Sequence, residues 1–378
     1  MAIIIIVKVI SEIHQSEWNT FVREHPDGSI FQTSEMMDLF NAANKFKPLL
    51  LGVYDENVLC GVLLGVFIHE REGIGKLLSS RFVIYGGPLL IGEAEQQTKS
   101  LDALLKALIL HTKRKALFIQ LRNFFDWQDL IPVFENNGFS YLERLNYIIQ
   151  VQGSEDPSTS SGQAPVQGVM EVVRGKMSES RRRQIEKALK SGAEIIEPGS
   201  IEQVKEFYDI LYKLYRYKVR KPLADWSFFE NFYQFTSPAP EPVLSLSKGP
   251  SSLVPRPPIG IIRLVKYDGR IIGGILAPVF EKKCIYEWYV CGLDKEYKEQ
   301  YPSVLATWAA LDYAINNNIE SFDFMGVGKP DVPYGVRDFK ARFGGELVNY
   351  GRLTRINNRF LYHIAELGYN VLALMKRI

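Results

Sequence analysis

The sequence predicts an α/β protein of two similar domains, each with a mixed β-sheet flanked by helices. The first observation is a weak internal repeat, because 51–67 and 264–280 both read as two apolar strands joined by a short Asp-containing turn. The second is the length, since 378 residues suffice for two domains that each bury a core. The third is that each half continues with a helix and an apolar strand, over 95–115 and 116–121 and over 302–317 and 320–324.

The elements of the first half follow from local patterns. The apolar start is interrupted by Lys8 and reads as a first strand. Gly86-Gly87-Pro88 must interrupt regular structure. The long helix repeats leucine at 101, 104, 105 and 108, which places one apolar stripe against the sheet. Further helices are expected near 16–25, 34–44 and 127–137, and a last strand near 139–150.

The second half begins with a helix that Ser178 can cap and Gly192 can end. Asp268-Gly269 is a strong hairpin signal, and Pro302 suits the first turn of a helix. A further helix is expected near 226–235. Two tracts rich in Ser, Gly and Pro lack the apolar content for a core and are predicted to be disordered. The predicted division is a first domain over 1–152, a linker over 153–169, and a second domain over 170–357 with a disordered loop at 236–258.

Composition excludes several classes of protein. The net charge of +2 gives no overall field for nucleic acid or membrane, so a polyanion must meet local basic patches. Three cysteines without a Cys-x-x-Cys pair argue against a disulfide framework and a zinc site. We read the apolar start as a strand rather than a signal peptide, and no stretch reaches transmembrane length. We therefore expect a cytoplasmic protein without a metal.

A lysine between two phenylalanines is the strongest functional signal. Lys340 lies between Phe339 and Phe343, with Gly344-Gly345 directly behind. An ammonium held by aromatic neighbours on a short helical turn is poorly hydrated and fixed in place. It is suited to stabilise negative charge that develops on an oxygen during acyl transfer. Ordinary helix ends show the same pattern, so its neighbours must support the interpretation.

The helix after Ser178 is the best candidate for binding a polyanion. Arg183, Lys187 and Lys190 share one face at three- and four-residue spacing, and guanidinium groups bind phosphate through paired N–H donors. A solvated basic face gives the same pattern, so both interpretations stay open. A second basic cluster at 215–222 ends a helix, where cations are favourable in any case.

Glu287 is the other conspicuous charge. In Tyr286-Glu287-Trp288-Tyr289 the side chains should alternate between the two faces of a strand. A carboxylate on a largely buried strand is costly unless it is paired. Glu287 is therefore either a structural carboxylate with a partner or part of a polar cleft.

Three features in chain order resemble the Fem family of peptidoglycan-bridge aminoacyltransferases. They are the helix begun by Pro302, the strand end Asp323-x-x-Gly326, and the Phe-Lys-x-x-Phe-Gly run around Lys340. The similarity is close over 271–350 and looser over nearly the whole chain. It implies tandem GNAT-like (acetyltransferase-like) domains and a C-terminal helix, 358–378, that packs on the first. It also implies aminoacyl-tRNA as donor, a peptidoglycan precursor as acceptor and no cofactor. We expect a monomer, and peripheral contact with a membrane-borne lipid-linked precursor stays open.

The resemblance assigns roles to individual residues. Lys340 stabilises the oxyanion formed when an amine attacks the donor ester, with Phe339 beside it. Asp323 is a candidate for removing the proton, as are water and the substrate. The other candidates are Tyr289, Glu287, Lys218, Arg220, Gly326 and Phe343 for substrate binding, and Arg182, Arg183 and Lys187 for tRNA or phosphate.

One departure affects the acceptor. The family commonly carries Gln-x-x-x-Trp-x-x-x-Lys in the first domain, whose lysine grips precursor phosphate, but this chain has Met36 and Phe40 after Gln32. A lipid-linked or quite different amine therefore stays open. The alternatives are an acyl-CoA-dependent N-acyltransferase of the GNAT superfamily and a non-catalytic binding protein. The acyl-CoA alternative needs a glycine-rich turn that binds the pyrophosphate of CoA. The Arg-x-Gly-x-Gly run at 71–75 has this composition, but we interpret it as a hairpin turn.

Overall fold

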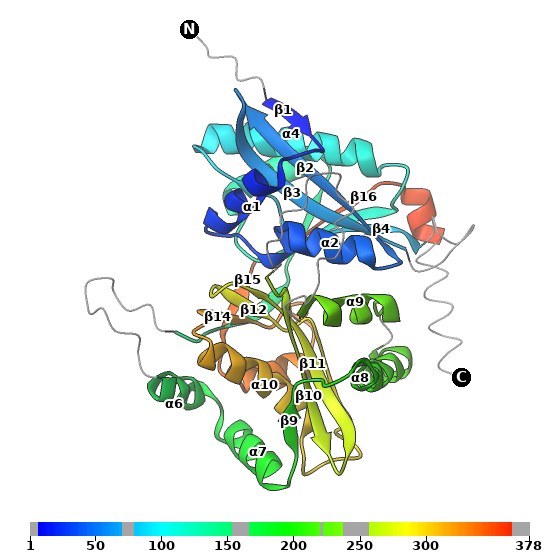
Figure 1. Cartoon of the computed structure of the whole chain (residues 1–378). Helices are drawn as coiled ribbons and strands as arrows, with labels where there is room; N and C mark the ends of the chain where they lie inside the picture. The colour runs from blue at the N-terminus through cyan, green and yellow to red at the C-terminus, as the bar shows by residue number, and fades with distance from the viewer. Residues whose placement is uncertain (1–6, 70–78, 153–165, 220–221, 237–256, 365–378) are drawn as a thin grey trace. The chain divides into compact units, whose positions relative to one another are not determined.

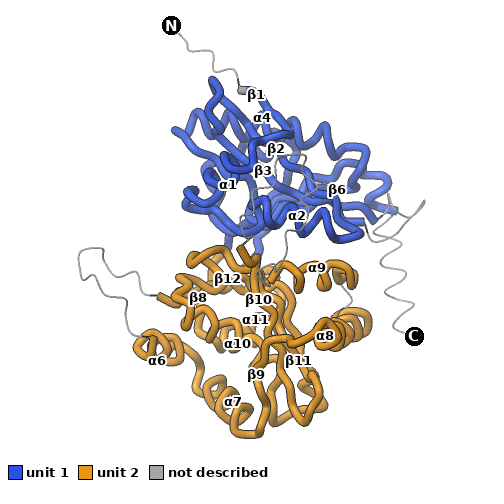
Figure 2. Tube along the Cα trace, viewed as in Figure 1, with its two compact units in different colours: residues 1–144, 349–378 blue, residues 145–348 orange. Residues whose placement is uncertain are grey.

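The computed structural model describes residues 7–69, 79–152, 166–219, 222–236 and 257–364. The chain divides into two compact units, residues 1–144 with 349–378 and residues 145–348 (Figure 2). Each unit has a mixed sheet covered by helices, as the sequence predicts. No described helix combines the length and the apolar character that spanning a bilayer requires.

In unit 1 the strand order is β1-β2-β3-β4-β6-β16-β7, with β5 paired to β3. One face carries the leucine stripe of α4, and α1 and α2 cover the other (Figure 1). The elements are β1 Val7–Ile10, α1 Gln15–Glu24, η1 Ile30–Gln32, α2 Ser34–Ala42, β2 Phe46–Asp55, β3 Val58–Ile68, β4 Arg81–Gly86, β5 Leu89–Leu90, α4 Ala94–Thr112, β6 Phe118–Asn123, η2 Gln128–Leu130, α5 Ile131–Asn136, β7 Ser140–Leu142 and β16 Arg352–Ile356.

In unit 2 the order is β15-β8-β14-β12-β11-β10-β9, with β13 paired to β11. Helix α10 packs in the core on one face with α6 and α7, while α8 and α9 pack on the other (Figure 1). The elements are β8 Leu145–Gln150, α6 Val166–Lys176, α7 Glu179–Lys190, β9 Glu194–Ile196, α8 Ile201–Leu214, the π-helix η3 Tyr215–Val219, α9 Trp226–Thr236, β10 Gly260–Tyr267, β11 Arg270–Phe280, β12 Cys284–Tyr286, β13 Tyr289–Gly292, α10 Pro302–Asn316, β14 Ser321–Asp323, α11 Gly335–Ala341 and β15 Glu346–Asn349.

The repeat seen in the sequence is a repeat of structure. Hairpins β2–β3 and β10–β11 are both antiparallel with one bulge, and both turn through two residues with positive φ, Glu56-Asn57 and Asp268-Gly269. Such turns match the right-handed twist of the strands. In each unit a crossover helix then adds a parallel strand, so β4 pairs with β6 and β12 pairs with β14.

The two units change over after residues 144 and 348, whereas the predicted domains end at residues 152 and 357. The strand predicted over 139–150 is two strands, of which β7 stays in the first sheet while β8 pairs with β14 in the second. Conversely, β16 lies inside the predicted second domain but pairs with β6 and β7 of the first sheet. Apolar alternation predicts which residues of a strand face the core, but it does not identify the partner strand.

Several predicted segments fall partly outside the described residues. Of the predicted linker over 153–169, only 166–169 are described, and they begin α6. Residues 237–256 of the predicted loop at 236–258 and residues 365–378 of the predicted C-terminal helix also lie outside the described residues. Helical residues 359–364 follow Asn358, whose side chain accepts a hydrogen bond from Leu361 N, and Tyr362 contacts Phe118 of unit 1.

We predict that the stability of unit 1 depends on β16, the strand that the chain adds to the first sheet after it has passed through unit 2. Leu353 of β16 is fully buried in the unit 1 core, so Leu353→Ala should cost about 2–5 kcal/mol. Hydrogen exchange should show faster exchange at β6 and β7, with β14 of unit 2 unchanged. The control is Ile356→Ala in the same strand, whose side chain is 38% exposed. Equal exchange at β6 in both variants would contradict the assignment of β16 to this core.

Candidate active site

Lys340 is buried in unit 2 near the end of α11, with 8% of its surface exposed. Its Nζ donates to the Phe324 carbonyl at 2.6 Å and lies 3.0 Å from Glu287 Oε1. A longer contact of 3.5 Å reaches the Gly326 carbonyl. The ammonium also lies over the Phe324 ring, 5.4 Å from its centroid. Of the three N–H donors of the ammonium, one is well used by Phe324 and one weakly by Gly326, while the contact with Glu287 is an ion pair without hydrogen-bond geometry.

Glu287 is the counter-charge of this lysine. It lies between β12 and β13, where the predicted continuous strand is interrupted, and only 3% of it is exposed. Thr307 of α10 donates to Oε2 at 2.8 Å, while Oε1 pairs with Lys340. The predicted partner is thus a hydrogen-bond donor for Oε2 and a counter-charge for Oε1, which accepts no hydrogen bond. Because the carboxylate bridges α10 and α11, it fixes the direction of the ammonium.

The strand end at Asp323 forms a tight turn beneath the lysine. Asp323 Oδ1 accepts from Met325 N at 2.5 Å and from Asn146 Nδ2 at 2.7 Å. The Asn146 side chain in turn accepts from Gly326 N at 2.7 Å. Met325 and Gly326 have φ of 57° and 111°, a conformation that glycine adopts readily. Burial raises the pKa of the Asp323 carboxyl, although these hydrogen bonds and Lys340 oppose the rise.

Arg181 holds α11 from the side of α7. It is 1% exposed, and its guanidinium lies between the rings of Phe339 and Phe343, 4.4 Å from each centroid. Nη2 donates to the Phe339 carbonyl at 2.7 Å, and Nη1 donates to Gln184 at 2.9 Å. Burial, with the nearby charge of Arg342, lowers the pKa of Arg181 to about 10. The two phenylalanines that frame Lys340 in sequence therefore clamp this arginine.

An aromatic cluster surrounds Tyr289, the predicted acceptor-site residue. Tyr289 packs against Phe229 and Trp288 with centroid distances of 5.1 and 5.8 Å, and Tyr215 lies 6.3 Å away. Tyr215 begins η3, a π-helical turn of a kind frequent at functional sites, and η3 also carries the exposed Lys218. Arg220 lies outside the described residues.

The predicted tRNA-binding residues of α7 are not gathered around Lys340. Arg183 is exposed and pairs with Glu179, and Lys187 is exposed and pairs with Glu299 at 2.9 Å. Arg182 makes a marginal contact of 3.5 Å to the Arg174 carbonyl. Acidic partners thus share this face, which makes it less basic than the sequence alone suggests.

Sequence reasoning missed Arg181, Thr307 and Asn146. A signal for Arg181 was available, because Arg181, Ile185 and Ala188 recur at helical spacing and all are buried. The arginine was therefore on the apolar stripe of its helix. Thr307 and Asn146 had no such signal, since one lies inside an apolar helix and the other on a strand predicted for the other domain.

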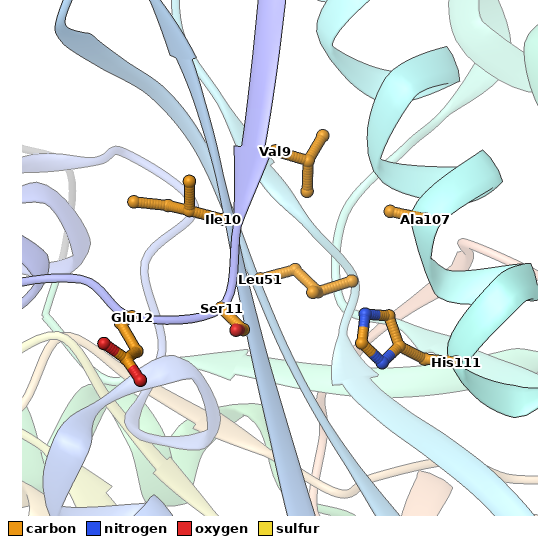
Figure 3. Close-up of a pocket in the computed structure, with 7 residues that line it drawn as sticks. All are labelled: Val9, Ile10, Ser11, Glu12, Leu51, Ala107 and His111. Atoms are coloured by element: carbon orange, nitrogen blue, oxygen red, sulfur yellow. The ribbon is translucent and has the colours of Figure 1, made fainter.

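A hollow of about 440 Å³ lies on unit 1 between β1 and α4 (Figure 3). Val9, Leu51 and Ala107 line it, with Glu12 and His111 at the exposed edge. None of the predicted site residues lies there. Among the described residues, no three His, Cys, Asp or Glu side chains are grouped to bind a metal. Cys284 has no activated thiol, because burial raises its pKa to about 12.

Residues 266–376 match the FemAB family. Among solved structures, FemX is similar with a TM-score of 0.63 and 16% identity over 94% of this chain and 99% of that one. A tandem GNAT protein from the clavulanic acid biosynthesis pathway matches with a TM-score of 0.54 and 9% identity over 93% and 99%. L-PGS from Bacillus licheniformis matches with a TM-score of 0.52 and 13% identity over 95% of this chain and 97% of that one. No curated protein matches by sequence.

These findings bear on the fold and the family. The structural likenesses show the fold alone, and it is the predicted fold of tandem GNAT-like units. The sequence match contains Asp323, Gly326 and the whole run around Lys340. Together they confirm the resemblance to the Fem family, with the FemAB match over residues 266–376 and the fold of FemX.

Proposed function

We propose that the protein is a Fem-like aminoacyltransferase that moves an amino acid from aminoacyl-tRNA to an amine of a peptidoglycan precursor. The observation that carries the proposal is the buried ammonium of Lys340, fixed by Phe324 and Glu287 with one N–H only weakly used. The FemAB match over the same residues supports the choice of chemistry. The fold shared with FemX is consistent with it.

The proposed reaction needs no nucleophilic side chain. The acceptor amine attacks the ester carbonyl, the C–N bond forms, and the carbonyl oxygen becomes an oxyanion. Lys340 turns its weakly used N–H from the Gly326 carbonyl to that oxygen, while its hydrogen bond to Phe324 and its ion pair with Glu287 are kept. The C–O bond to ribose then breaks, and the ribose oxygen takes up a proton as the amine loses one.

A structural role is sufficient to explain why an aspartate stands at position 323. Its Oδ1 is occupied by Met325 N and Asn146, so that oxygen maintains the turn that presents the Gly326 carbonyl to Lys340. Its part in proton removal stays a prediction. Water or the substrate itself can take the proton instead.

The geometry at the start of α10 disfavours an acyl-CoA donor. GNAT enzymes that use CoA hold its pyrophosphate on free backbone N–H groups at a helix start. Here Ser303 N donates to Asp294 Oδ1 at 3.0 Å, and the Ser303 hydroxyl donates to Oδ2 at 2.6 Å. A carboxylate thus already occupies the positive end of this helix, where it would repel a phosphate.

The direct test is Lys340→Met, assayed with charged tRNA and a muropeptide precursor, with label transfer followed by mass spectrometry. Loss of one oxyanion donor should lower kcat about 10²–10³-fold. Acetyl-CoA should not replace the charged tRNA. Unchanged turnover would show that the lysine is structural, and transfer from acetyl-CoA alone would favour the GNAT alternative. Label lost from neither donor would favour a binding protein.

Two controls separate chemistry from folding. Lys340→Met leaves a buried carboxylate unpaired, which can cost about 3–5 kcal/mol of stability. The double variant Lys340→Met with Glu287→Gln removes that charge, so it should recover stability but not activity. Lys329→Met changes an exposed lysine in the neighbouring loop and should leave transfer unchanged.

We also predict that Arg181 positions Lys340. Arg181→Lys keeps a charge but loses the hydrogen bond to Phe339 and the stacking between two rings. Misplacement of the ammonium should lower kcat on the order of 10–100-fold with KM nearly unchanged. In a Lys340→Met background the same change should add no further loss. Arg270→Lys, an exposed substitution, is the control, and additive losses in the double variant would contradict the positioning role.

A further inference from the structure

Two arginines of unit 1, Arg122 and Arg352, are cross-strand partners near the end of the parallel strands β4 and β6, and a third lies close enough for its charge to act on one of them. Tyr85 of β4 is the partner of Arg122 on β6, and Arg122 is the partner of Arg352 on β16. Tyr85, Arg122 and Arg352 therefore form one row across the three adjacent strands β4, β6 and β16. The charge of Arg144, which follows β7, also acts on Arg352. Like charges placed opposite each other on a sheet are unfavourable.

No acid in the described part of the chain balances this row. Among the residues that the structure describes, no carboxylate lies within ion-pair distance of Arg122, Arg144 or Arg352. Arg352 Nε is buried and has no hydrogen-bond partner. The neighbouring Glu143 accepts from Asn349 at 2.9 Å instead. Burial, with the charges of Arg122 and Arg144, lowers the pKa of Arg352 to about 9.

Arg122 is held in place with its donors barely used. Its guanidinium lies over the Tyr85 ring, 5.0 Å from the centroid. Its two hydrogen bonds are long, 3.3 Å to Gln120 and 3.4 Å to the Tyr85 hydroxyl. Stacking fixes the plane of a guanidinium while leaving its N–H edge available for an oxyanion.

We propose that Arg122, Arg144 and Arg352 bind a phosphate or diphosphate group of a ligand. An unpaired, partly buried guanidinium beside two like charges is costly, and a multiply charged oxyanion removes that cost. The inference depends on the proposed function only for the molecule that carries the phosphate. The inference also concerns α2, where Met36 and Phe40 stand in place of the tryptophan and the phosphate-binding lysine of the Fem pattern. Both side chains are buried and apolar, so they cannot hold an anion.

The test is calorimetric titration of the full chain with inorganic pyrophosphate, without donor or acceptor. We expect binding that Arg122→Gln and Arg352→Gln each weaken at least about tenfold. Arg355→Gln is the matched control, because Arg355 lies on the same strand but alternates to the other face and donates to the Asn137 carbonyl at 3.0 Å. The Arg355→Gln variant should bind pyrophosphate as tightly as the parent protein does. Absence of binding, or equal loss in all three variants, would overturn the site.

Two further measurements sharpen the result. Because Arg352→Gln removes an unpaired charge, its Tm without ligand should rise by about 2–4 °C, and a fall would contradict the unbalanced row. Titrations with uridine diphosphate and with farnesyl diphosphate then distinguish a nucleotide carrier from a lipid carrier. Whichever of the two binds should bind more weakly to the Arg122→Gln and Arg352→Gln variants than to the parent. Intact pyrophosphate binding without aminoacyl transfer would support this site while contradicting only the proposed function.

Discussion

The arrangement of the candidate active site depends on one buried ion pair. Lys340 and Glu287 are 8% and 3% exposed, and their charged atoms are 3.0 Å apart. Charges so poorly solvated are tolerated only when their remaining donors and acceptors are satisfied. Thr307 satisfies Glu287 Oε2 and the Phe324 carbonyl accepts from Lys340, while Glu287 Oε1 has only the ammonium as its counter-charge. The pair thus joins α10, α11 and the strand end at Asp323 into one polar centre. A surface lysine would have neither the fixed direction nor the weak hydration.

The surroundings of the pair explain why α11 can be so short. A helix of seven residues has little stability of its own, so tertiary contacts must hold it. Arg181 supplies them with a hydrogen bond to Phe339 and by stacking between the rings of Phe339 and Phe343, and the Gly326 carbonyl makes a long contact with Lys340. The phenylalanines of the motif are thus needed as much for Arg181 as for the lysine. This explains why the lysine is framed by aromatic residues in the sequence.

Much of the fold could be predicted because it is encoded locally. The Asp268-Gly269 turn, the Ser178 cap and the Pro302 helix start are each decided by residues within a few positions. The exchange of β8 and β16 between sheets could not be predicted, since pairing across many residues leaves no mark on a strand's own alternation. For the candidate site, Lys340 and Glu287 could be proposed from their residue types and neighbours and Asp323 from the family resemblance, whereas Thr307 and Asn146 became apparent only when the fold placed them.

The most direct measurement is a crystal structure with an aminoacyl-adenosine phosphonate, whose tetrahedral group mimics the oxyanion. The account predicts a phosphonate oxygen about 2.7–3.1 Å from Lys340 Nζ, with the Gly326 carbonyl released and the Glu287 and Phe324 contacts kept. A phosphonate bound elsewhere, with all three contacts of Lys340 as they are now, would contradict it.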